Sequence, residues 1–405
     1  MSPTTFTSRE SFVKIDSVDM FYLAMPEILD IGDGSQDMLL VRVRSGGWTG
    51  WGECEASPLP TIASLVCPMS HSACHPVIDS VVGEVLDGPE DIRRVGRLVR
   101  ARSLDLLQAE HALSGIEIAL WDLLGQIREQ PVYELLGFSS ASPKTPYASA
   151  LFGGTPQDTL DKARECVSQG YHAVKFGWGP YGTGTVDEDA AQVHAAREGL
   201  GPDRVLLVDA GTVWEDDVDA AAARLPDLAD VRALWLEEPF VGVAVRSYAA
   251  LAAMSGSVRI AGGEGAHSRH MAEQLIDHGR VGFIQIDTGR IGGIAPAHDV
   301  ACYARANDVQ FVNHTFTSHL ALSASLQPNA GAAEDWICEF PVEAKRLATD
   351  LTRNHIVRDS DGLVAAPSAP GLGMELDLDA VRQYVVPVEI VVAGKVLYCT
   401  PELTP

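Results

Sequence analysis

The sequence predicts a two-domain α/β protein in which a small α+β domain precedes a larger domain of parallel strands. Three observations predict this fold class. The chain has 405 residues, more than one compact core usually holds. Residues 12–140 contain strand patterns followed by helix patterns, an order typical of α+β domains. After the Ser/Pro-rich segment 139–146, short apolar strands alternate with helical segments, which indicates right-handed crossovers and a parallel sheet.

Strands are expected first, within residues 12–55, where apolar and β-branched runs are separated by GDG and SGG turn signals. Residues 25–36 join the first two runs and are expected to form a mobile loop. Residues 57–75 are expected to be irregular. Residues 76–129 are expected to be helical, with a long buried helix within 106–128, because apolar residues recur there at helical spacing.

The sequence after residue 146 predicts repeated strand–helix units. In the first crossover, Thr155 caps a helix, Pro156 takes its first position and Gly170 ends it. Seven or eight such units in about 200 residues favour a closed barrel, and an open doubly wound sheet is the alternative. The predicted strands are YASALF, YHAVKF, RVLLVD, VRALWLE, VRIAGGE, VGFIQID and VQFVNH.

Composition and motifs exclude several classes of protein. The formal net charge is −25, which repels nucleic acid and anionic membrane surfaces. The chain has no GxGxxG after its first strand and no GxxxxGK[ST], so dinucleotide and nucleoside-triphosphate binding of the usual kind are not expected. The seven cysteines form no CxxC pair, and neither a signal peptide nor an apolar membrane span is evident. A cytoplasmic protein with free thiols is expected.

Ionisable residues stand at the carboxyl ends of successive predicted strands. From the third strand onward they are spaced by about one strand–helix unit, and in a barrel all of them would meet at the catalytic face. One polar residue often marks only where a strand stops. A series of charged or imidazole side chains in consecutive units favours an active site instead. They are Lys175, Asp209, Glu237, Glu264, Asp287 and His314.

The three central carboxylates predict a metal. Asp209, Glu237 and Glu264 in an apolar mouth cannot all stay ionised without a cation. Mg²⁺ suits oxygen ligands and leaves open positions for substrate, whereas the lack of Cys and His argues against zinc. The neighbouring lysine, histidine and aspartate suit removal of a proton next to a carboxylate, with the ion and the ammonium stabilising the enediolate.

These motifs resemble the enolase superfamily and, within it, the mandelate racemase / muconate lactonizing enzyme-like group of acid-sugar dehydratases and racemases. The resemblance covers nearly the whole chain. It implies a modified TIM barrel, (β/α)7β, with an N-terminal α+β capping domain, and it implies a homo-oligomer. The motifs occur in the family's order: ALSGIEIALWDLLG, QPVYELLG, VKF, VD, WLEEP, GGE, IDTGRIGG and NH.

The resemblance also implies the domain boundaries. Residues 1–140 would form the capping domain, with substrate-specificity loops at about 25–36 and 55–75. Residues 141–370 would form the barrel that carries the metal and the catalytic residues. Residues 371–405 would return to the cap.

Carried over residue by residue, the resemblance makes Asp209, Glu237 and Glu264 the metal ligands, whereas the adjacent Glu238 is not expected to bind the ion. Asp287 and His314 match the catalytic dyad.

Two further positions complete the implied site. Glu339, in WICEFP at the eighth strand, matches a residue that hydrogen-bonds the substrate carboxylate. Lys175 matches the first lysine of the family's Lys-x-Lys motif.

The chain departs from the family pattern at two glycines. Gly177 stands where the second lysine of Lys-x-Lys is usual, which disfavours racemisation by two opposed bases. Lys175 would then contact the substrate carboxylate or act as a base, and His314 would serve both steps of a dehydration. Gly211 stands where many members have Asn, which weakens the expected support for the metal ligands.

Other residues have open roles. His319 competes with His314 for the dyad, and His314 is preferred because it ends the apolar run VQFV. Residues of the cap loops either select substrate or are exposed polar groups: Glu55, Ser57, His71 and His75. His267 is a candidate substrate contact. The aromatic residues Trp178, Tyr181 and Trp214 are expected to pack or to form a wall.

The sequence therefore predicts a Mg²⁺-dependent dehydratase acting on a sugar acid or related α-hydroxy carboxylate and giving a 2-keto-3-deoxy acid. The alternatives are a racemase, epimerase or cycloisomerase on the same scaffold and a non-catalytic carboxylate-binding barrel. The particular substrate and its stereochemistry depend on cap-loop geometry, which periodicity does not reach.

Overall fold

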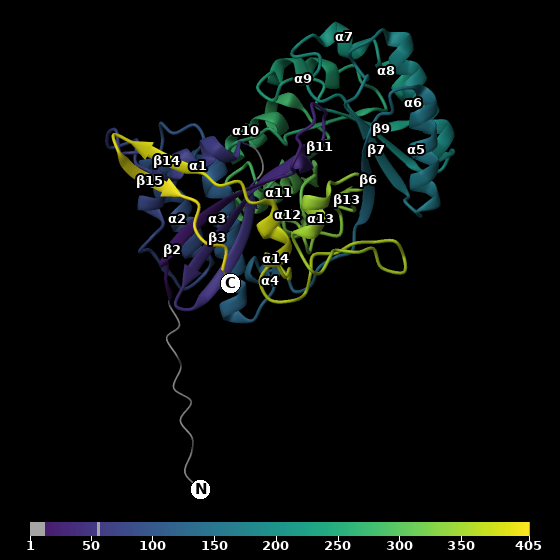
Figure 1. Ribbon diagram of the computed structural model, residues 1–405. Coiled ribbons are helices and arrows are strands. Elements are labelled where there is room, and N and C mark those ends of the chain that lie inside the picture. Colours follow the sequence, from purple (N-terminus) through teal and green to yellow (C-terminus); the bar gives the residue numbers. More distant parts are fainter. Residues whose placement is uncertain (1–12, 55–56, 405) are drawn as a thin grey trace.

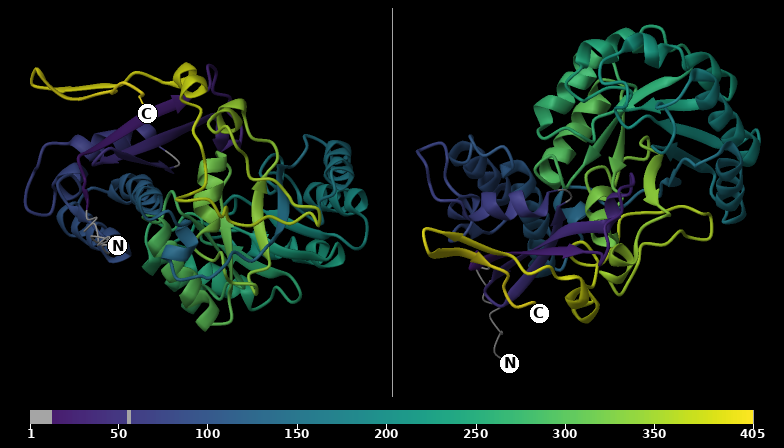
Figure 2. Two further views of the ribbon diagram at one scale, coloured as in Figure 1. Left: turned by 90° about the horizontal axis from the view of Figure 1, so that it is seen from below. Right: turned by 45° about the horizontal axis from the view of Figure 1, so that its top comes forward.

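The computed structural model describes residues 13–54 and 57–404. A capping domain and a barrel lie side by side, as Figures 1 and 2 show, with the early strands and the end of the chain together in the cap. This arrangement confirms the predicted fold class: a parallel barrel with a separate antiparallel sheet and helices before it.

Eight parallel strands form the barrel, and their order in the sheet follows the chain except that the last strand pairs with the first. This order excludes the open doubly wound alternative. The strands are β6 Thr145–Leu151, β7 Ala173–Gly177, β8 Val205–Asp209, β9 Ala233–Glu237, β10 Arg259–Gly262, β11 Phe283–Asp287, β12 Gln310–His314 and β13 Ile337–Pro341.

A side chain bridges the seam between β12 and β13. Asn313, buried in β12, accepts a hydrogen bond from the Glu339 N–H at 2.9 Å and donates one to the Glu339 carbonyl at 3.4 Å. The amide thus satisfies both backbone groups of one β13 residue, as a neighbouring strand would. The seam separates two predicted site residues, His314 and Glu339.

Helices cover the outside of the barrel. The first follows its expected capping signals, since Thr155 accepts from the Asp158 N–H and Asp158 accepts in return from the Thr155 N–H. The helices after β6–β12 are α5 Pro156–Ser168, α6 Val186–Leu200, α7 Val218–Ala222, α8 Leu225–Asp230, α9 Val245–Ala252, α10 Arg269–Gln274, α11 Ile294–Ala306 and α12 His319–Leu326.

The cap consists of a three-stranded antiparallel meander and helices packed on it. Its strands are β2 Ser17–Ala24, β3 Asp37–Ser45 and β4 Trp48–Cys54, and a separate pair joins β1 Val13–Lys14 to β5 Val85–Leu86. Its helices are α1 Pro58–Val66, α2 Pro89–Arg102, α3 Ala109–Arg128 and α4 Val132–Leu135.

The long helix α3 lies directly on β4 because two glycines leave room for its backbone. A Cβ atom at Gly50 would lie 2.2 Å from the Ala119 carbonyl oxygen, and one at Gly52 would lie 2.2 Å from the Gly115 carbonyl oxygen. This close approach buries the C-terminal end of β4, including Glu53 and Cys54, whereas Trp48 at its other end is exposed.

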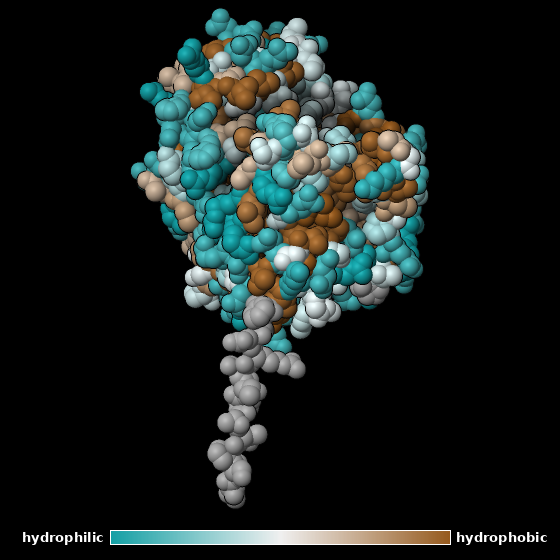
Figure 3. Space-filling view, turned by 90° about the vertical axis from the view of Figure 1, so that its left-hand side faces the viewer, coloured by the Kyte–Doolittle hydropathy of each residue, from teal (hydrophilic) through white to brown (hydrophobic). Residues whose placement is uncertain are grey.

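The end of the chain packs on the cap. After α13 Arg346–Asp350 come α14 Leu378–Val381 and the hairpin β14 Glu389–Val392 with β15 Lys395–Cys399. The fully buried Arg42 of β3 donates to the carbonyl oxygens of Glu402, at 3.1 Å, and Thr404. Figure 3 views the molecule from the side of this hairpin, where apolar areas interrupt the hydrophilic surface.

Two expectations for the cap were wrong. Residues 76–129 were expected to be helical, but Val77–Ser80 form a 3₁₀ turn and Val85–Leu86 form the strand β5. Residues 57–75 were expected to be irregular, but Pro58–Val66 form helix α1, with Ile62 and Leu65 buried. Pro58 and Pro60 resemble loop signals in the sequence, yet both lie in the first turn, where a helix needs no N–H from them. Residues 25–36 do form a connection with only a short 3₁₀ turn, Gly34–Gln36. Phe12 and Glu55 lie outside the described residues.

Among the described residues, no helix is both long and apolar enough to cross a membrane.

The close packing of α3 on β4 predicts that Gly52→Ala destabilises the protein by about 1–3 kcal/mol, because the new methyl group must displace helix backbone. The matched control is Gly242→Ala, where an added Cβ meets nothing within 4 Å. Urea unfolding of the two variants checks the prediction, and equal midpoints would contradict it.

Candidate active site

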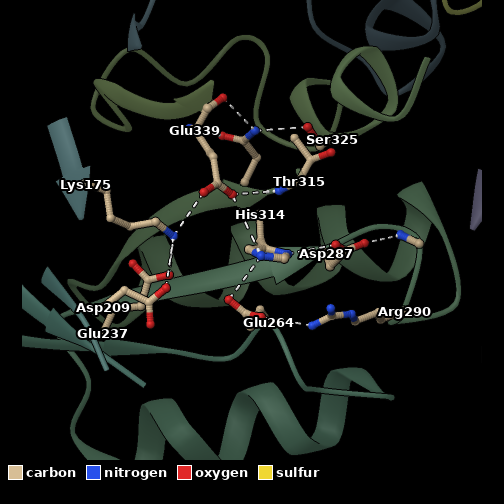
Figure 4. Close-up of polar contacts among 12 residues, drawn as sticks. Lys175, Asp209, Glu237, Glu264, Asp287, Arg290, His314, Thr315, Ser325 and Glu339 are labelled. Carbon is tan, nitrogen blue, oxygen red and sulfur yellow. Dashed lines mark hydrogen bonds and ion pairs between the residues drawn. The ribbon is translucent and has the colours of Figure 1, made fainter. Parts of the chain in front are cut away.

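The barrel opens at the carboxyl ends of its strands into a cavity of about 550 Å³. Strand register brings its polar residues together, since Asp209 lies beside Glu237, and Asp287 beside His314. Figure 4 shows the side chains of the predicted site converging from successive strands. Those that line the cavity are Lys175, Asp209, Glu264, His314 and Glu339.

Lys175 lies at the centre of three carboxylates. Its Nζ is 2.6 Å from Glu237 Oε1, 3.0 Å from Glu339 Oε1 and 3.7 Å from Asp209 Oδ2. All four side chains are buried. Although burial alone lowers the pKa of an ammonium group, the charges of Glu237 and Glu339 raise that of Lys175 well above its ordinary value. Lys175 is therefore held as a cation.

His314 is fixed by the carboxylate of Asp287. His314 Nδ1 lies 2.8 Å from Asp287 Oδ2, and the other Asp287 oxygen accepts from the Gly289 N–H at 2.6 Å. This contact leaves Nε2 facing the mouth, 3.1 Å from Glu264 Oε2. Burial lowers the pKa of His314, but the charges of Glu264, Glu339 and Asp287 outweigh it and raise the pKa to about 10.

Arg290 is a site residue that sequence reasoning did not assign. Its guanidinium contacts Glu264 Oε1 at 3.0 Å and lies over the ring of Phe316. The signal was present in the sequence: Arg290 stands three residues after Asp287, just past a strand end, in a strongly acidic chain. Burial raises the pKa of Glu264, but His314 and Arg290 lower it below its ordinary value.

Two carboxyl groups of the mouth carry raised pKa values. Burial raises the pKa of Asp209 to about 6 and that of Glu237 to about 8, against the opposing charge of Lys175. Carboxylates outnumber cations here, so part of the negative charge is uncompensated by protein groups. This excess is what a divalent cation would neutralise.

The three proposed metal ligands offer only hard oxygen atoms, from β8, β9 and the loop just after β10, and this donor chemistry fits Mg²⁺. Within residues 13–54 and 57–404, however, no three His, Cys, Asp or Glu side chains form a ready-made metal site. Lys175 and Trp235 contact the Glu237 oxygens, and His314 and Arg290 contact those of Glu264.

Both glycine departures have a steric cause. A Cβ atom at Gly177 would lie 2.8 Å from Cβ and Oδ2 of Asp209. Gly211 has a φ of +56°, and a Cβ atom there would lie 2.9 Å from the Trp178 ring. The Gly211 N–H donates to Asp209 Oδ1 at 2.8 Å, so a backbone group supports this carboxylate.

The cap loop 25–36 reaches the rim of the cavity. Lys345 Nζ lies 3.2 Å from Asp33 Oδ2, and the Lys345 N–H donates to Ser35 Oγ at 2.8 Å. Trp178, half-exposed, lines the same cavity. The cap loop and the segment after β13 therefore meet at the rim of the cavity.

Other predicted candidates lie away from the cavity lining. His319 stacks on His355 with ring centroids 4.3 Å apart, so it does not compete with His314 for the contact to Asp287. His71 contacts Asp105, and His75 lies beside Arg102.

Three aromatic and cap residues complete this comparison. Tyr181 and Trp214 pack against each other, as expected for wall residues, and Ser57 is exposed at the start of α1.

His267 contacts the cap instead of the cavity. Its Nδ1 lies 3.2 Å from Nε2 of the buried His111 in α3, whose Nδ1 contacts Gln108. The histidine pair thus joins the two domains beside the mouth.

These features define a class of two-domain α/β barrel proteins. The cap consists of an antiparallel meander and helices, and the mouth of the barrel is acidic and carries a lysine and a histidine. Residues 27–137 match the family model "Mandelate racemase / muconate lactonizing enzyme, N-terminal domain", and residues 158–380 match "Enolase C-terminal domain-like". The chain belongs to the mandelate racemase / muconate lactonizing enzyme family of the enolase superfamily.

Relatives that are named for an activity include dehydratases and cycloisomerases. The D-galactarolactone cycloisomerase of Agrobacterium fabrum is 29% identical over 366 residues, covering 84% of this chain and 89% of the relative. The D-galactonate dehydratase of Xanthomonas oryzae pv. oryzae strain PXO99A is 30% identical over 351 residues, covering 83% and 88%. These relatives support an enzymatic role.

Solved structures agree in fold. One described as a predicted mandelate racemase from Rhodobacter sphaeroides is 59% identical, with a TM-score of 0.92, covering 96% of this chain and all of that one. A member of the enolase superfamily from Polaromonas sp. JS666 is 27% identical, with a TM-score of 0.78, covering 92% and 98%.

The histidine pair predicts a loss of stability in acid. Burial first, and then His267 and Arg290, lower the pKa of His111 from 6.5 to about 4. Between these values the unfolded chain takes up a proton that the folded chain refuses, so the free energy of unfolding falls as pH falls from 6.5 to 4. His111→Gln should lose less stability between pH 7 and pH 5 than the wild type. Urea unfolding at both pH values measures this, with the exposed His270→Gln as control, and an unchanged loss in His111→Gln would refute the prediction.

Proposed function

We propose that the protein is a Mg²⁺-dependent dehydratase of a sugar acid or related α-hydroxy carboxylate. The observation that carries the proposal is the one-sided arrangement of proton-transfer groups. His314, oriented by Asp287, faces the mouth from β12, while Lys175 on β7 is tied to three carboxylates and Gly177 supplies no second base. One base that returns its proton suits elimination better than racemisation by two bases.

In this proposal neutral His314 takes, through Nε2, the proton next to the substrate carboxylate and then gives it to the departing β-hydroxyl. The negative charge of Glu264, which raises the pKa of His314 in this structure, is one that a bound divalent cation would offset, and the ring would then lose its proton more readily. Asp287 holds the ring and stabilises the imidazolium between the two steps. Lys175 neutralises charge on the enediolate. The enol product then ketonises to a 2-keto-3-deoxy acid. Glu339 positions the carboxylate end of the substrate, and its own place is set by the Thr315 N–H, which donates to Glu339 Oε2 at 2.8 Å.

Asp209, Glu237 and Glu264 are the proposed ligands of Mg²⁺, which when bound would act as a Lewis acid for the substrate carboxylate. Each of these carboxylates contacts a cation of the protein in this structure. Metal binding is therefore expected to compete with Lys175 for Glu237 and with Arg290 for Glu264.

Cycloisomerisation is the second candidate, because a cycloisomerase relative matches 84% of this chain at 29% identity. It shares the proton-abstraction step and differs in losing no water. The relatives' names support the sugar-acid substrate class. A cytoplasmic homo-oligomer is also part of the proposal. The exposed valines of the β14–β15 hairpin are consistent with contact to another copy: Val391, Val392 and Val396.

Incubation of the protein with Mg²⁺ and a panel of sugar acids and their lactones tests the proposal, with semicarbazide detecting 2-keto acids. A dehydratase gives a semicarbazone from an open-chain acid. Isomerised product without loss of water would favour the cycloisomerase. Solvent deuterium at the α-carbon of recovered substrate, without elimination, would favour an epimerase or racemase. Binding of Mg²⁺ with no turnover of any acid would favour a non-catalytic barrel.

His314→Asn is expected to lower kcat by at least about 10²-fold, since general acid–base catalysis contributes that much, while Mg²⁺ affinity stays within a few-fold of wild type. Turnover assays and titration calorimetry with Mg²⁺ measure the two effects. A variant that retains activity would exclude His314 as the proton-transfer group.

Glu237→Gln is expected to weaken Mg²⁺ binding by about 10-fold or more, because it removes a ligand charge.

Lys175→Ala should leave Mg²⁺ affinity equal or higher, since the competing ammonium is gone, and should lower kcat strongly. Calorimetry separates the two variants. Activity of Lys175→Ala within a few-fold of wild type would contradict the role of Lys175 in stabilising the enediolate.

A further inference from the structure

Glu53 is a buried carboxyl group of the cap that the proposed reaction leaves without a role. It lies in β4, is 1% exposed, and accepts a hydrogen bond through Oε2 from the Ser318 hydroxyl. Its other oxygen, Oε1, makes no hydrogen bond of ordinary geometry to any residue in the described part of the chain. Nearby Thr317 and Ser318 lower the pKa of the carboxyl group, but a buried oxygen that makes no hydrogen bond of ordinary geometry is costly, so its position calls for a reason.

A small polar cavity accounts for the direction of that oxygen. Glu53 and Asp287 line the same enclosed space of about 10 Å³, the size of about one water molecule. The remaining lining residues are Thr288, Gly289, Thr315, Thr317 and Ala321. The cavity therefore lies between the cap and the carboxylate that orients His314.

The same residue is connected to the segment that carries His314. This segment runs from His314, at the end of β12, to Ser318, which caps α12 by accepting from the Leu320 and Ala321 N–H groups. The Ser318 hydroxyl itself donates a hydrogen bond to Glu53. Glu53 is thus connected to the Asp287–His314 pair in two ways. It accepts a hydrogen bond from Ser318, in the segment that follows His314, and it lines the cavity beside Asp287.

The protonation state of Glu53 is consistent with this connection. Burial and the charge of Asp287 raise the pKa of Glu53, whereas Ser318 and Thr317 lower it. The net result is a pKa of about 7. Two ionised carboxylates around one buried cavity would repel each other, whereas a neutral Glu53 can donate a proton toward Asp287, directly or through a water molecule.

We propose that Glu53, through Ser318 and the polar cavity beside Asp287, is a positioning residue for the Asp287–His314 pair and makes proton transfer by His314 depend on the packing of the cap. This inference rests on the proposed function, because it assigns Glu53 a part in that reaction. It does not place Glu53 in contact with substrate.

The test compares Glu53→Ala with Glu53→Gln. The amide of Gln can accept from Ser318 and donate toward Asp287, so Glu53→Gln should keep kcat within about threefold of wild type. Glu53→Ala should lower kcat about 10- to 100-fold, the usual effect of removing such a supporting partner, with KM within about twofold.

Glu117 of α3 provides a matched control. It is also a buried cap carboxyl with a pKa raised by burial to about 7, and it accepts from the Ile294 and Ala295 N–H groups of α11, away from the dyad. Glu117→Ala should lower the unfolding midpoint but leave the kcat of the folded protein unchanged. Equal losses of kcat in Glu53→Ala and Glu117→Ala would show a general effect of cap stability and overturn the proposal.

A second readout does not need turnover. The Nδ1 proton shared by His314 and Asp287 gives a low-field proton NMR signal, identified by its absence in His314→Asn. Glu53→Ala should shift or broaden this signal through faster solvent exchange, and Glu53→Gln and Glu117→Ala should not. An unchanged signal in Glu53→Ala overturns the proposal whether or not a substrate has been found. A Glu53→Gln variant as impaired as Glu53→Ala would also overturn it, since an ionised Glu53 would then be required.

Discussion

Buried negative charge at one end of the barrel is the constraint on which the site depends. Parallel strands deliver carboxylates to the same place, and burial makes each of them costly to ionise. The chain compensates them with a small number of fixed cations: Lys175 holds three, and His314 and Arg290 hold Glu264 from two sides. The contacts that balance this charge also orient Lys175 and His314 toward the mouth.

The capping domain contributes more than a cover. Its loop 25–36 meets the segment after β13 through Asp33 and Lys345, and α3 meets the barrel through His111 and Glu117. Glu53 reaches farther, to the segment that follows His314. The cap therefore contacts the barrel at several places around the site. A displacement of the cap would loosen groups that never touch substrate.

Much of this fold and site could be predicted from sequence because periodicity specifies it. Strand–helix alternation predicts the barrel, and residues at successive strand ends, such as Asp209 and His314, must then meet. Periodicity does not report side-chain contacts between distant segments, so the partners of Glu53 and Arg290 were not predicted. Helix α1 was missed because Pro58 and Pro60 resemble loop residues. The bridge that Asn313 makes across the seam depends on tertiary geometry alone.

The contact between Arg42 and the end of the chain has a consequence for biosynthesis. Arg42 is buried in the first sheet of the protein, yet its guanidinium binds carbonyl groups 360 and 362 residues later. A ribosome makes Arg42 before the barrel strands and its partners after them, so the sheet that contains Arg42 cannot make these contacts until the barrel has been synthesised. The barrel, whose strands pair mainly with neighbours in the chain, has its partners at hand sooner. Loss of the Glu402 and Thr404 carbonyl groups should therefore damage the sheet that contains Arg42, although the whole barrel lies between them in the sequence.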